Sequence, residues 1–230
     1  MQRAIARPAS RVDALPWFSA ATGIALLIAA ALVLSAPADA VQGIVQKIFY
    51  LHVPAAIAAY ACFTAVLVGG LVYLWNESSA ADRLARVSAE VGLVLTTVAL
   101  VMGSIWARPI WGTWWQWDDP RLVSTLVLWL IYSGYLLVRR IAAPGRQAAR
   151  FAAVVGIVGF IDVPVVHFSV TWWRTIHPPL SAAEPASLPG AMLPAFVVST
   201  LAVLMLAALM VWLRYRLEIG RERLAEARLA

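Results

Sequence analysis

Cysteine is almost absent from this chain of 230 residues, and its one cysteine, Cys62, lies inside a long apolar segment. A single cysteine cannot form an internal disulfide or a CxxC pair, so thiol–disulfide chemistry is not expected. Charged residues are also scarce, at 13% of the chain, and no carboxylate cluster suggests a site for a hard cation. No internal repeat is evident, which removes one common feature of permeases.

Apolar residues dominate instead, at 62% of the sequence, well above the roughly 45–50% of a soluble domain. Six segments reach the length of about 20 apolar residues that crosses a bilayer. They are predicted at residues 15–36, 48–75, 89–107, 122–138, 151–171 and 190–213. We therefore predict an all-α membrane protein with six transmembrane helices, forming a single membrane domain over residues 1–230.

The distribution of basic residues predicts the orientation. All but four of the 18 lysines and arginines lie in the two terminal tails and in the second and fourth connections. Because positive charge marks the cytoplasmic side, both termini are predicted to be cytoplasmic. The exceptions on the outer, periplasmic side are Lys47, Arg108, Arg121 and Arg174. The net charge of +6 thus follows topology and does not indicate nucleic-acid binding.

The first apolar segment could be mistaken for a cleaved signal peptide, because small residues at 36–40 resemble a cleavage site. Its apolar run of about 22 residues exceeds the roughly 7–15 of a signal peptide. It is therefore predicted to be a membrane span.

Tryptophans gather between the third and fourth predicted spans. Five lie within twelve positions: Trp106, Trp111, Trp114, Trp115 and Trp117. Indole is hard to bury completely, and a lipid-facing belt needs only one or two rings per helix end. Residues 106–121 are therefore predicted to be a periplasmic loop that presents a flat aromatic surface.

Two acids, Asp118 and Asp119, end this loop and are followed by Pro120. Aspartate before a proline favours an N-cap of the fourth span. A role in orienting an indole N–H or Arg121 stays open beside that interpretation.

Two of the three histidines are predicted at the outer ends of spans: His52 in the second and His177 after the fifth. A hydrogen-bonded interfacial residue is the simpler interpretation of either one alone. Two imidazoles at similar depth, however, suit the axial positions of a low-spin haem. The tryptophans would form its aromatic floor, and its propionates would bind the cations Arg108, Arg121 and Arg174.

Without a CxxCH motif such a haem would be non-covalent haem b, held transiently. No nucleophile–base pair is visible, so binding and presentation are predicted rather than catalysis. The third histidine, His167, lies inside the fifth span and is not assigned as a ligand. Asp162, the one acid deep in a span, is predicted to form a hydrogen bond between helices, with a proton path or a haem contact as the alternatives.

Three motifs carry a resemblance to a known family: WGTWWQWD followed by Arg121, YLHVPAA around His52, and HFSVTWWRTIH ending at His177. Over roughly residues 40–215 the sequence resembles the cytochrome c maturation protein C family, also called haem exporter protein C. The resemblance implies that residues 106–118, with His52 and His177, hold haem at the periplasmic face of the bacterial inner membrane for delivery to a periplasmic haem chaperone, cytochrome c maturation protein E.

The same resemblance implies an ATP-binding-cassette pair (proteins A and B) and a small single-span subunit (protein D) as partners in the bilayer. The sequence departs from the family in reading WDDPRL where WDAR is usual, which adds one residue before Arg121. It also departs at Asp162, where relatives commonly have an amide.

Other interpretations remain. A permease for a small hydrophobic substrate would use the aromatic stretch as a gate. A cytochrome c synthetase subunit of the same superfamily would be longer and have more spans. A scaffold subunit would not need the two outer histidines.

Overall fold

The computed structural model describes residues 13–141, 145–177, 188, 190 and 192–229. Within these ranges the chain is helical, with no strand beyond one isolated bridge between Asp39 and Gly43. The elements are α1 (Leu15–Ser35), the 3₁₀ helix η1 (Ile44–Ile48), α2 (Phe49–Asn76), α3 (Ser79–Trp111), α4 (Pro120–Ile141), α5 (Arg146–Phe160), α6 (Asp162–Trp172) and α8 (Leu193–Leu229).

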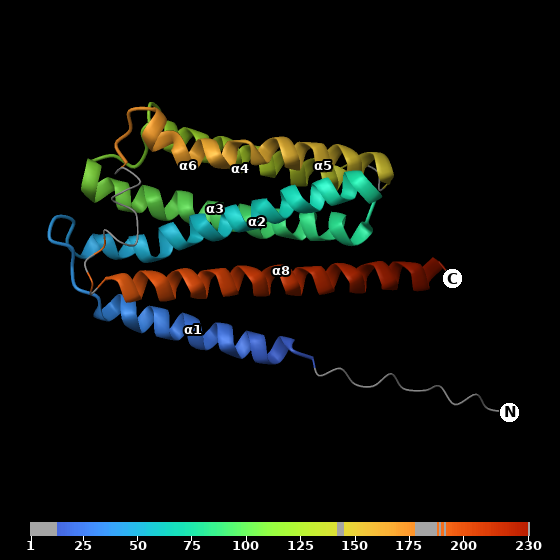
Figure 1. Cartoon of the computed structure of the whole chain (residues 1–230), viewed down its shortest axis with the longest axis horizontal. Coiled ribbons are helices and arrows are strands. Elements are labelled where there is room, and N and C mark those ends of the chain that lie inside the picture. The colour runs from blue at the N-terminus through green and yellow to red at the C-terminus, as the bar shows by residue number, and fades with distance from the viewer. Residues whose placement is uncertain (1–12, 142–144, 178–187, 189, 191, 230) are drawn as a thin grey trace.

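Six helical stretches are long and apolar enough to cross a membrane, which confirms the predicted class. They are Leu15–Ser35, Ile44–Asn76, Ser79–Trp111, Pro120–Ile141, Arg146–Trp172 and Leu193–Arg228. In Figure 1 the helices run side by side along the long axis of the molecule, with α4, α5 and α6 at one edge and α1 at the other. We call the end of the bundle that carries residues 106–117 the loop end.

Two predicted spans are too short. Helix α3 begins at Ser79 rather than at residue 89, with the Ser78 hydroxyl accepting a hydrogen bond from the Ala81 amide at 3.3 Å. Helix α8 continues to Leu229 rather than ending at 213. Hydropathy missed both extensions because they carry charges, and these charges pair with one another across the two helices, as between Arg83 and Glu222.

The predicted fifth span is two helices, since α5 ends at Phe160 and α6 begins at Asp162. The cause is Pro164, which has no N–H to donate to the carbonyl of Phe160. Both α5 and α6 pack against α4, and α6, which includes His167, is the part of this span nearer the loop end (Figure 1).

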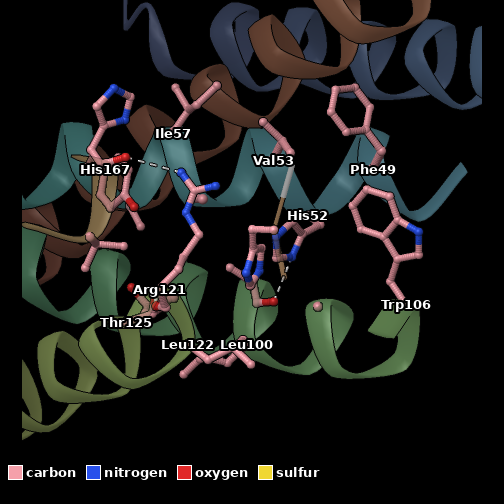
Figure 2. A pocket seen from close by; sticks show the side chains of 18 of the residues that line it. Phe49, His52, Val53, Ile57, Leu100, Trp106, Arg121, Leu122, Thr125 and His167 are labelled. Atoms are coloured by element: carbon pink, nitrogen blue, oxygen red, sulfur yellow. Dashed lines mark hydrogen bonds between the residues drawn. The ribbon is translucent and has the colours of Figure 1, made fainter. Parts of the chain in front are cut away.

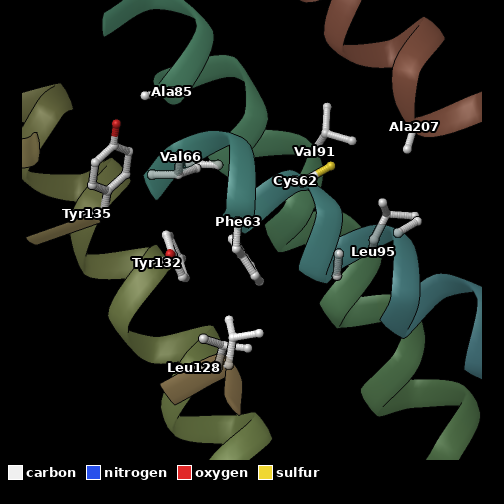
Figure 3. Packing of buried hydrophobic residues seen from close by; sticks show 14 of the residues in the cluster. Cys62, Phe63, Val66, Ala85, Val91, Leu95, Leu128, Tyr132, Tyr135 and Ala207 are labelled. Carbon is white, nitrogen blue, oxygen red and sulfur yellow. The ribbon is translucent and has the colours of Figure 1, made fainter. Parts of the chain in front are cut away.

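The core lies where α2, α3, α4 and α5 meet, and Figure 3 shows its larger side chains. The rings of Phe63 and Tyr132 stack with centroids 3.8 Å apart and are fully buried. Gly92 on α3 leaves room for the Phe63 ring of α2, because a Cβ at Gly92 would lie 2.7 Å from that ring. This packing sets the distance between α2 and α3 and hence the frame of the cavity described next.

Candidate functional site

A cavity of about 660 Å³ opens among α2, α3, α4, α6 and α8 at the loop end. Its volume falls within the roughly 300–1,000 Å³ of small-molecule and cofactor sites. Figure 2 shows Trp106 and Phe49 at one end of it, Arg121 and His167 at the other, and His52 between them. Most of the lining is apolar, so the few polar groups determine what the cavity can bind.

One face of α3 forms a long wall of this cavity. Its lining residues recur every three or four positions and include Thr96, Ala99, Gly103, Trp106 and Ile110. This spacing is that of a single helix face. The tryptophan-rich stretch therefore begins inside α3, and the prediction that 106–121 is all loop is wrong for Trp106–Trp111.

His52 reaches the cavity from the first turn of α2. Its Nδ1 lies 2.9 Å from the carbonyl oxygen of Ala99, an acceptor only, so Nδ1 carries the proton and donates. Gly103 leaves room for the ring, because a Cβ there would lie 2.9 Å from His52 Cε1. The other nitrogen, Nε2, therefore keeps a free lone pair in a side chain that lines the cavity.

His177 lines the same cavity from the segment that follows α6. Its Nδ1 lies 3.2 Å from Oδ1 of Asp119, and its side chain is 14% exposed. The carboxylate is an acceptor only, so Nδ1 is the donor in this contact, and in the neutral imidazole the lone pair is then on Nε2. In both histidines Nδ1 is engaged in a hydrogen bond, and Nε2 is the nitrogen that could bind a metal. This arrangement is typical of metal-ligating imidazole.

Asp119 holds the His177 segment in place. The carboxylate caps α4, accepting from the amides of Arg121 and Leu122 at 3.0 Å each, and also accepts from the Thr175 hydroxyl. Burial of this carboxyl acts to raise its pKa, but the hydrogen bonds from His177, Thr175 and Leu122 outweigh burial and hold the pKa well below its usual range. Asp119 is therefore a carboxylate near neutral pH.

The tryptophans divide into two groups. Trp106 and Trp111 line the cavity and pack edge-on against the two histidines, with centroid distances of 5.9 Å to His52 and 5.0 Å to His177. Trp114, Trp115 and Trp117 do not line it. The side chains of Trp114 and Trp117 are 58% and 74% exposed, so they form an outer aromatic surface rather than a cavity floor.

Of the three predicted arginines only Arg121 reaches the cavity. Its guanidinium lies 3.5 Å from the carbonyl oxygen of His167, and among the described residues it forms no ion pair. Arg108 is exposed and donates to the carbonyl of Gly112, four residues on, at the end of α3. Arg174 is exposed and does not line the cavity.

The sequence matches the family described as Heme exporter protein C over residues 4–230. This chain belongs to that family. Among curated relatives of that name, the Bradyrhizobium diazoefficiens protein is 41% identical over 73% of this chain and 63% of its own length. The Escherichia coli protein is 40% identical over 62% of this chain and 58% of its own length. The Paracoccus denitrificans protein is 34% identical over 92% of this chain and 88% of its own length.

The matched parts of the first two relatives are thus less than two thirds of those proteins. Membership in the haem exporter protein C family and six spans identify a multi-pass protein of the bacterial inner membrane.

The sequence predicts for Asp119 an N-cap, or the orientation of an indole N–H or Arg121, but not its contact with His177. Asp118, the acid that the resemblance includes in the haem-holding stretch 106–118, is exposed and does not line the cavity. The cap prediction placed Asp119 at the right helix end. Nothing local in the sequence of this haem exporter protein C member connects it with residues 175–177, which lie 56 or more positions away.

Asp162 lies in a second, smaller pocket, beside Pro120, Ser124 and Trp173. Its Oδ2 is buried and has no hydrogen-bond partner among the described residues, so the interhelical hydrogen bond predicted for it is not found there. This pocket is separate from the histidine cavity. The described residues also contain no group of three or more His, Cys, Asp or Glu side chains that could hold a metal ion by themselves.

Proposed function

We propose that this protein binds haem b non-covalently in the histidine cavity, with the iron between His52 and His177, and presents it to a periplasmic haem chaperone for c-type cytochrome biogenesis. The observation that carries the proposal is the pair of imidazoles in one apolar cavity, each with Nδ1 donating to a fixed acceptor. The relatives named Heme exporter protein C support the choice of haem.

Iron ligation follows from this arrangement. A hydrogen bond at Nδ1 fixes the ring orientation and increases the basicity of Nε2. His52 donates to a neutral carbonyl and His177 to a carboxylate, so His177 is the more strongly donating ligand. Two neutral imidazoles give a low-spin iron, as in b-type cytochromes.

The haem carboxylates find their partner in Arg121. It is the only lysine or arginine among the described lining residues, and it takes part in none of the ion pairs found between described residues. A planar guanidinium can bind a carboxylate through two parallel hydrogen bonds. We therefore propose that the propionate edge faces Arg121, which lies at the end of the cavity opposite Trp106 and Phe49 (Figure 2).

In this proposal the chain holds the haem and presents it to the chaperone, and no catalytic group of this chain is needed for the transfer. The exposed rings of Trp114 and Trp117 supply the surface on which the chaperone, cytochrome c maturation protein E, docks. With the loop end on the periplasmic side, the ATP-binding-cassette pair (proteins A and B) and the single-span protein D complete the assembly in the bilayer.

The test is the absorption spectrum of the purified full-length protein from haem-replete cells. We expect a low-spin, bis-imidazole spectrum that is lost in His52→Ala and in His177→Ala. His167→Ala is the matched control, because His167 lines the cavity but is exposed and lies at the end of the cavity near Arg121, away from His52 (Figure 2). A wild-type protein that stays colourless even after added haemin would overturn the proposal and favour a permease.

A further inference from the structure

The cavity is exposed on the membrane side rather than at the water-facing end. Of its lining residues only four are exposed: Ile57, His167, Val197 and Leu201. The exposed fractions of Ile57, Val197 and Leu201 are 36%, 41% and 56%. All four belong to helices that cross the membrane. We call this place the lateral opening.

The course of α2 explains why an opening exists there. In Figure 1, α2 begins beside α8 near the loop end and finishes beside α5 at the other end. Helix α6 packs against α4 and α5, and its packing with α2 and α8 is at most marginal. Because α2 departs diagonally from the α4–α6 edge, the bundle is not closed on that side in the half nearest the loop end.

The water-facing end of the cavity is closed more tightly. Trp106 donates its indole N–H to the side-chain oxygen of Gln42 at 2.9 Å, joining α3 to the segment before η1. Trp111 and His177 pack edge-on against each other in the same cavity lining, and none of these four side chains is exposed. Passage from water would have to break these contacts, whereas passage from the bilayer would not.

The chemistry of the lateral opening suits an amphipathic planar ligand. Ile57, Val197 and Leu201 match the hydrocarbon of the membrane. Arg121 lines the cavity together with Ile57, and its guanidinium donates to the carbonyl of His167, as Figure 2 shows. Ile57 is five residues after His52, about 7.5 Å deeper along a helix that rises 1.5 Å per residue.

We propose that haem enters the cavity sideways from the lipid bilayer, through the lateral opening, and not from the water-facing end. This inference rests on the proposed haem binding and adds its route. Haem partitions into membranes, so it arrives with its ring among the acyl chains, and Arg121 then draws its carboxylates inward. Without a partner protein, dissociation follows the same path in reverse.

The experiment measures rates as well as affinity, using the full-length apo-protein in phospholipid vesicles and haemin as the probe. Ile57→Trp and Leu201→Trp each place a large ring at the opening, on two different helices. The matched control is Val68→Trp on α2, a residue that is 52% exposed and does not line the cavity. Uptake and release are followed by the shift of the haem absorption band.

We expect both opening variants to slow uptake and release by the same factor, about tenfold for a barrier about 1.4 kcal/mol higher. Both residues line the cavity, so the dissociation constant is measured separately, and any change in it is taken out before the two rates are compared. Val68→Trp should behave as wild type. The wild-type uptake rate should rise with the amount of haemin per lipid.

Unchanged rates in both opening variants would overturn the lateral route. Slowing of uptake alone, or of release alone, would overturn it too. Two helices are used so that a folding defect in one variant leaves the other to decide. Failure of the wild-type protein to bind haemin at all is a different result, because it refutes the proposed function and not the route alone.

Discussion

Asp119 joins two segments that are more than fifty residues apart in the chain. Its two carboxylate oxygens accept from the start of α4 on one side and from Thr175, Ile176 and His177 on the other. The side chain is 2% exposed, so these hydrogen bonds form with little competition from water. One buried carboxylate therefore sets both the cap of a helix and the orientation of a candidate iron ligand.

We predict that Asp119→Asn weakens haem binding while the protein still folds. Asparagine caps a helix nearly as well as aspartate, but it cannot give the imidazole a charged acceptor. Loss of such a partner typically costs 10–100-fold in metal affinity, and a loss of about that size is expected here. Haemin titration measures the change, with Asp118→Asn as the matched control. Equal affinities for the two variants would contradict this role for Asp119.

Arg121 is the second residue on which binding depends. Arg121→Gln should lower haem affinity about tenfold or more, since a charge-assisted hydrogen bond contributes roughly 1.5–3 kcal/mol. Haem dimethyl ester, which has no carboxylate, should bind the variant and the wild type alike. Arg108→Gln, at an exposed position outside the cavity, should leave haem affinity unchanged. If Arg121→Gln weakens binding of the ester as strongly as binding of haem, Arg121 acts through folding.

Helix α3 connects the cavity to the outer aromatic surface. It carries Gly103, Trp106 and Trp111 along the cavity wall and ends at Trp111. The next residue, Gly112, has a φ of 76°, in the left-handed region. Glycine adopts this conformation without strain, and the Gly112 amide closes the helix by donating to Arg108. Beyond Gly112 the tryptophans no longer line the cavity, and Trp114 and Trp117 are exposed.

At this scale we predict that the outer tryptophans serve docking rather than haem affinity. Trp117→Ala and Trp114→Ala should weaken the chaperone complex by about 2 kcal/mol or more, as aromatic hot spots do at interfaces. The dissociation constant for haem should not change. Co-purification of the haem-loaded chaperone measures docking. Trp75→Ala is the control, because that ring is 91% exposed but lies at the opposite end of α2. Normal docking by both loop variants would refute the prediction.

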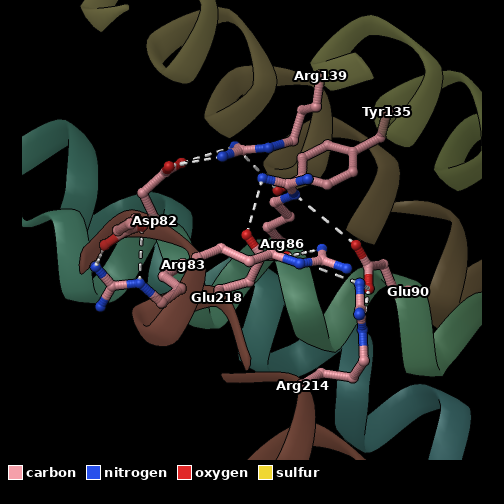
Figure 4. Close-up of polar contacts among 10 residues, drawn as sticks. Asp82, Arg83, Arg86, Glu90, Tyr135, Arg139, Arg214 and Glu218 are labelled. Atoms are coloured by element: carbon pink, nitrogen blue, oxygen red, sulfur yellow. Dashed lines mark hydrogen bonds and ion pairs between the residues drawn. The ribbon is translucent and has the colours of Figure 1, made fainter. Parts of the chain in front are cut away.

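The molecule as a whole separates its stabilising charges from its site. Figure 4 shows arginines and acids paired across α3, α4 and α8 near the end opposite the loop end. Asp82 accepts two hydrogen bonds from Arg139 at 2.7 and 2.6 Å, and Glu90 accepts one from Arg214 at 2.8 Å. The ion pairs fasten three helices at one end, while the cavity occupies the other.

Arg139→Met should therefore destabilise the fold without changing haem affinity. The Arg139 and Asp82 side chains are only 12% and 21% exposed, so the acid left behind stays poorly hydrated. We expect a loss of about 2 kcal/mol, somewhat less than the 3–5 kcal/mol for a fully buried pair. Thermal unfolding in detergent measures it.

Arg146→Met is the control for this prediction, since that arginine pairs with Glu77 but is 73% exposed. An exposed pair contributes at most about 1 kcal/mol. A loss of stability in Arg146→Met as large as that in Arg139→Met would show that burial of the pair is not the cause.

The six spans, and two histidines at the same end of the bundle, could be predicted from the sequence, because apolar length and charge are properties that add up along the chain. The bounds of α3 and α8 could not, since pairing of their charges depends on how the helices meet. For the same reason the sequence could not show that Asp119, and not Asp118, contacts His177. Nor could it show that Arg121 lines the cavity while Arg108 and Arg174 do not. Which side of a helix faces a cavity, and which distant residue supplies a hydrogen bond, depend on packing between segments far apart in sequence.

The sequence alone thus determined that this is a six-span membrane protein with two histidines toward one face. Only the tertiary structure decided that both histidines line one cavity with Nδ1 already bonded, because α2, α3, α4 and the segment after α6 must pack together before those contacts exist.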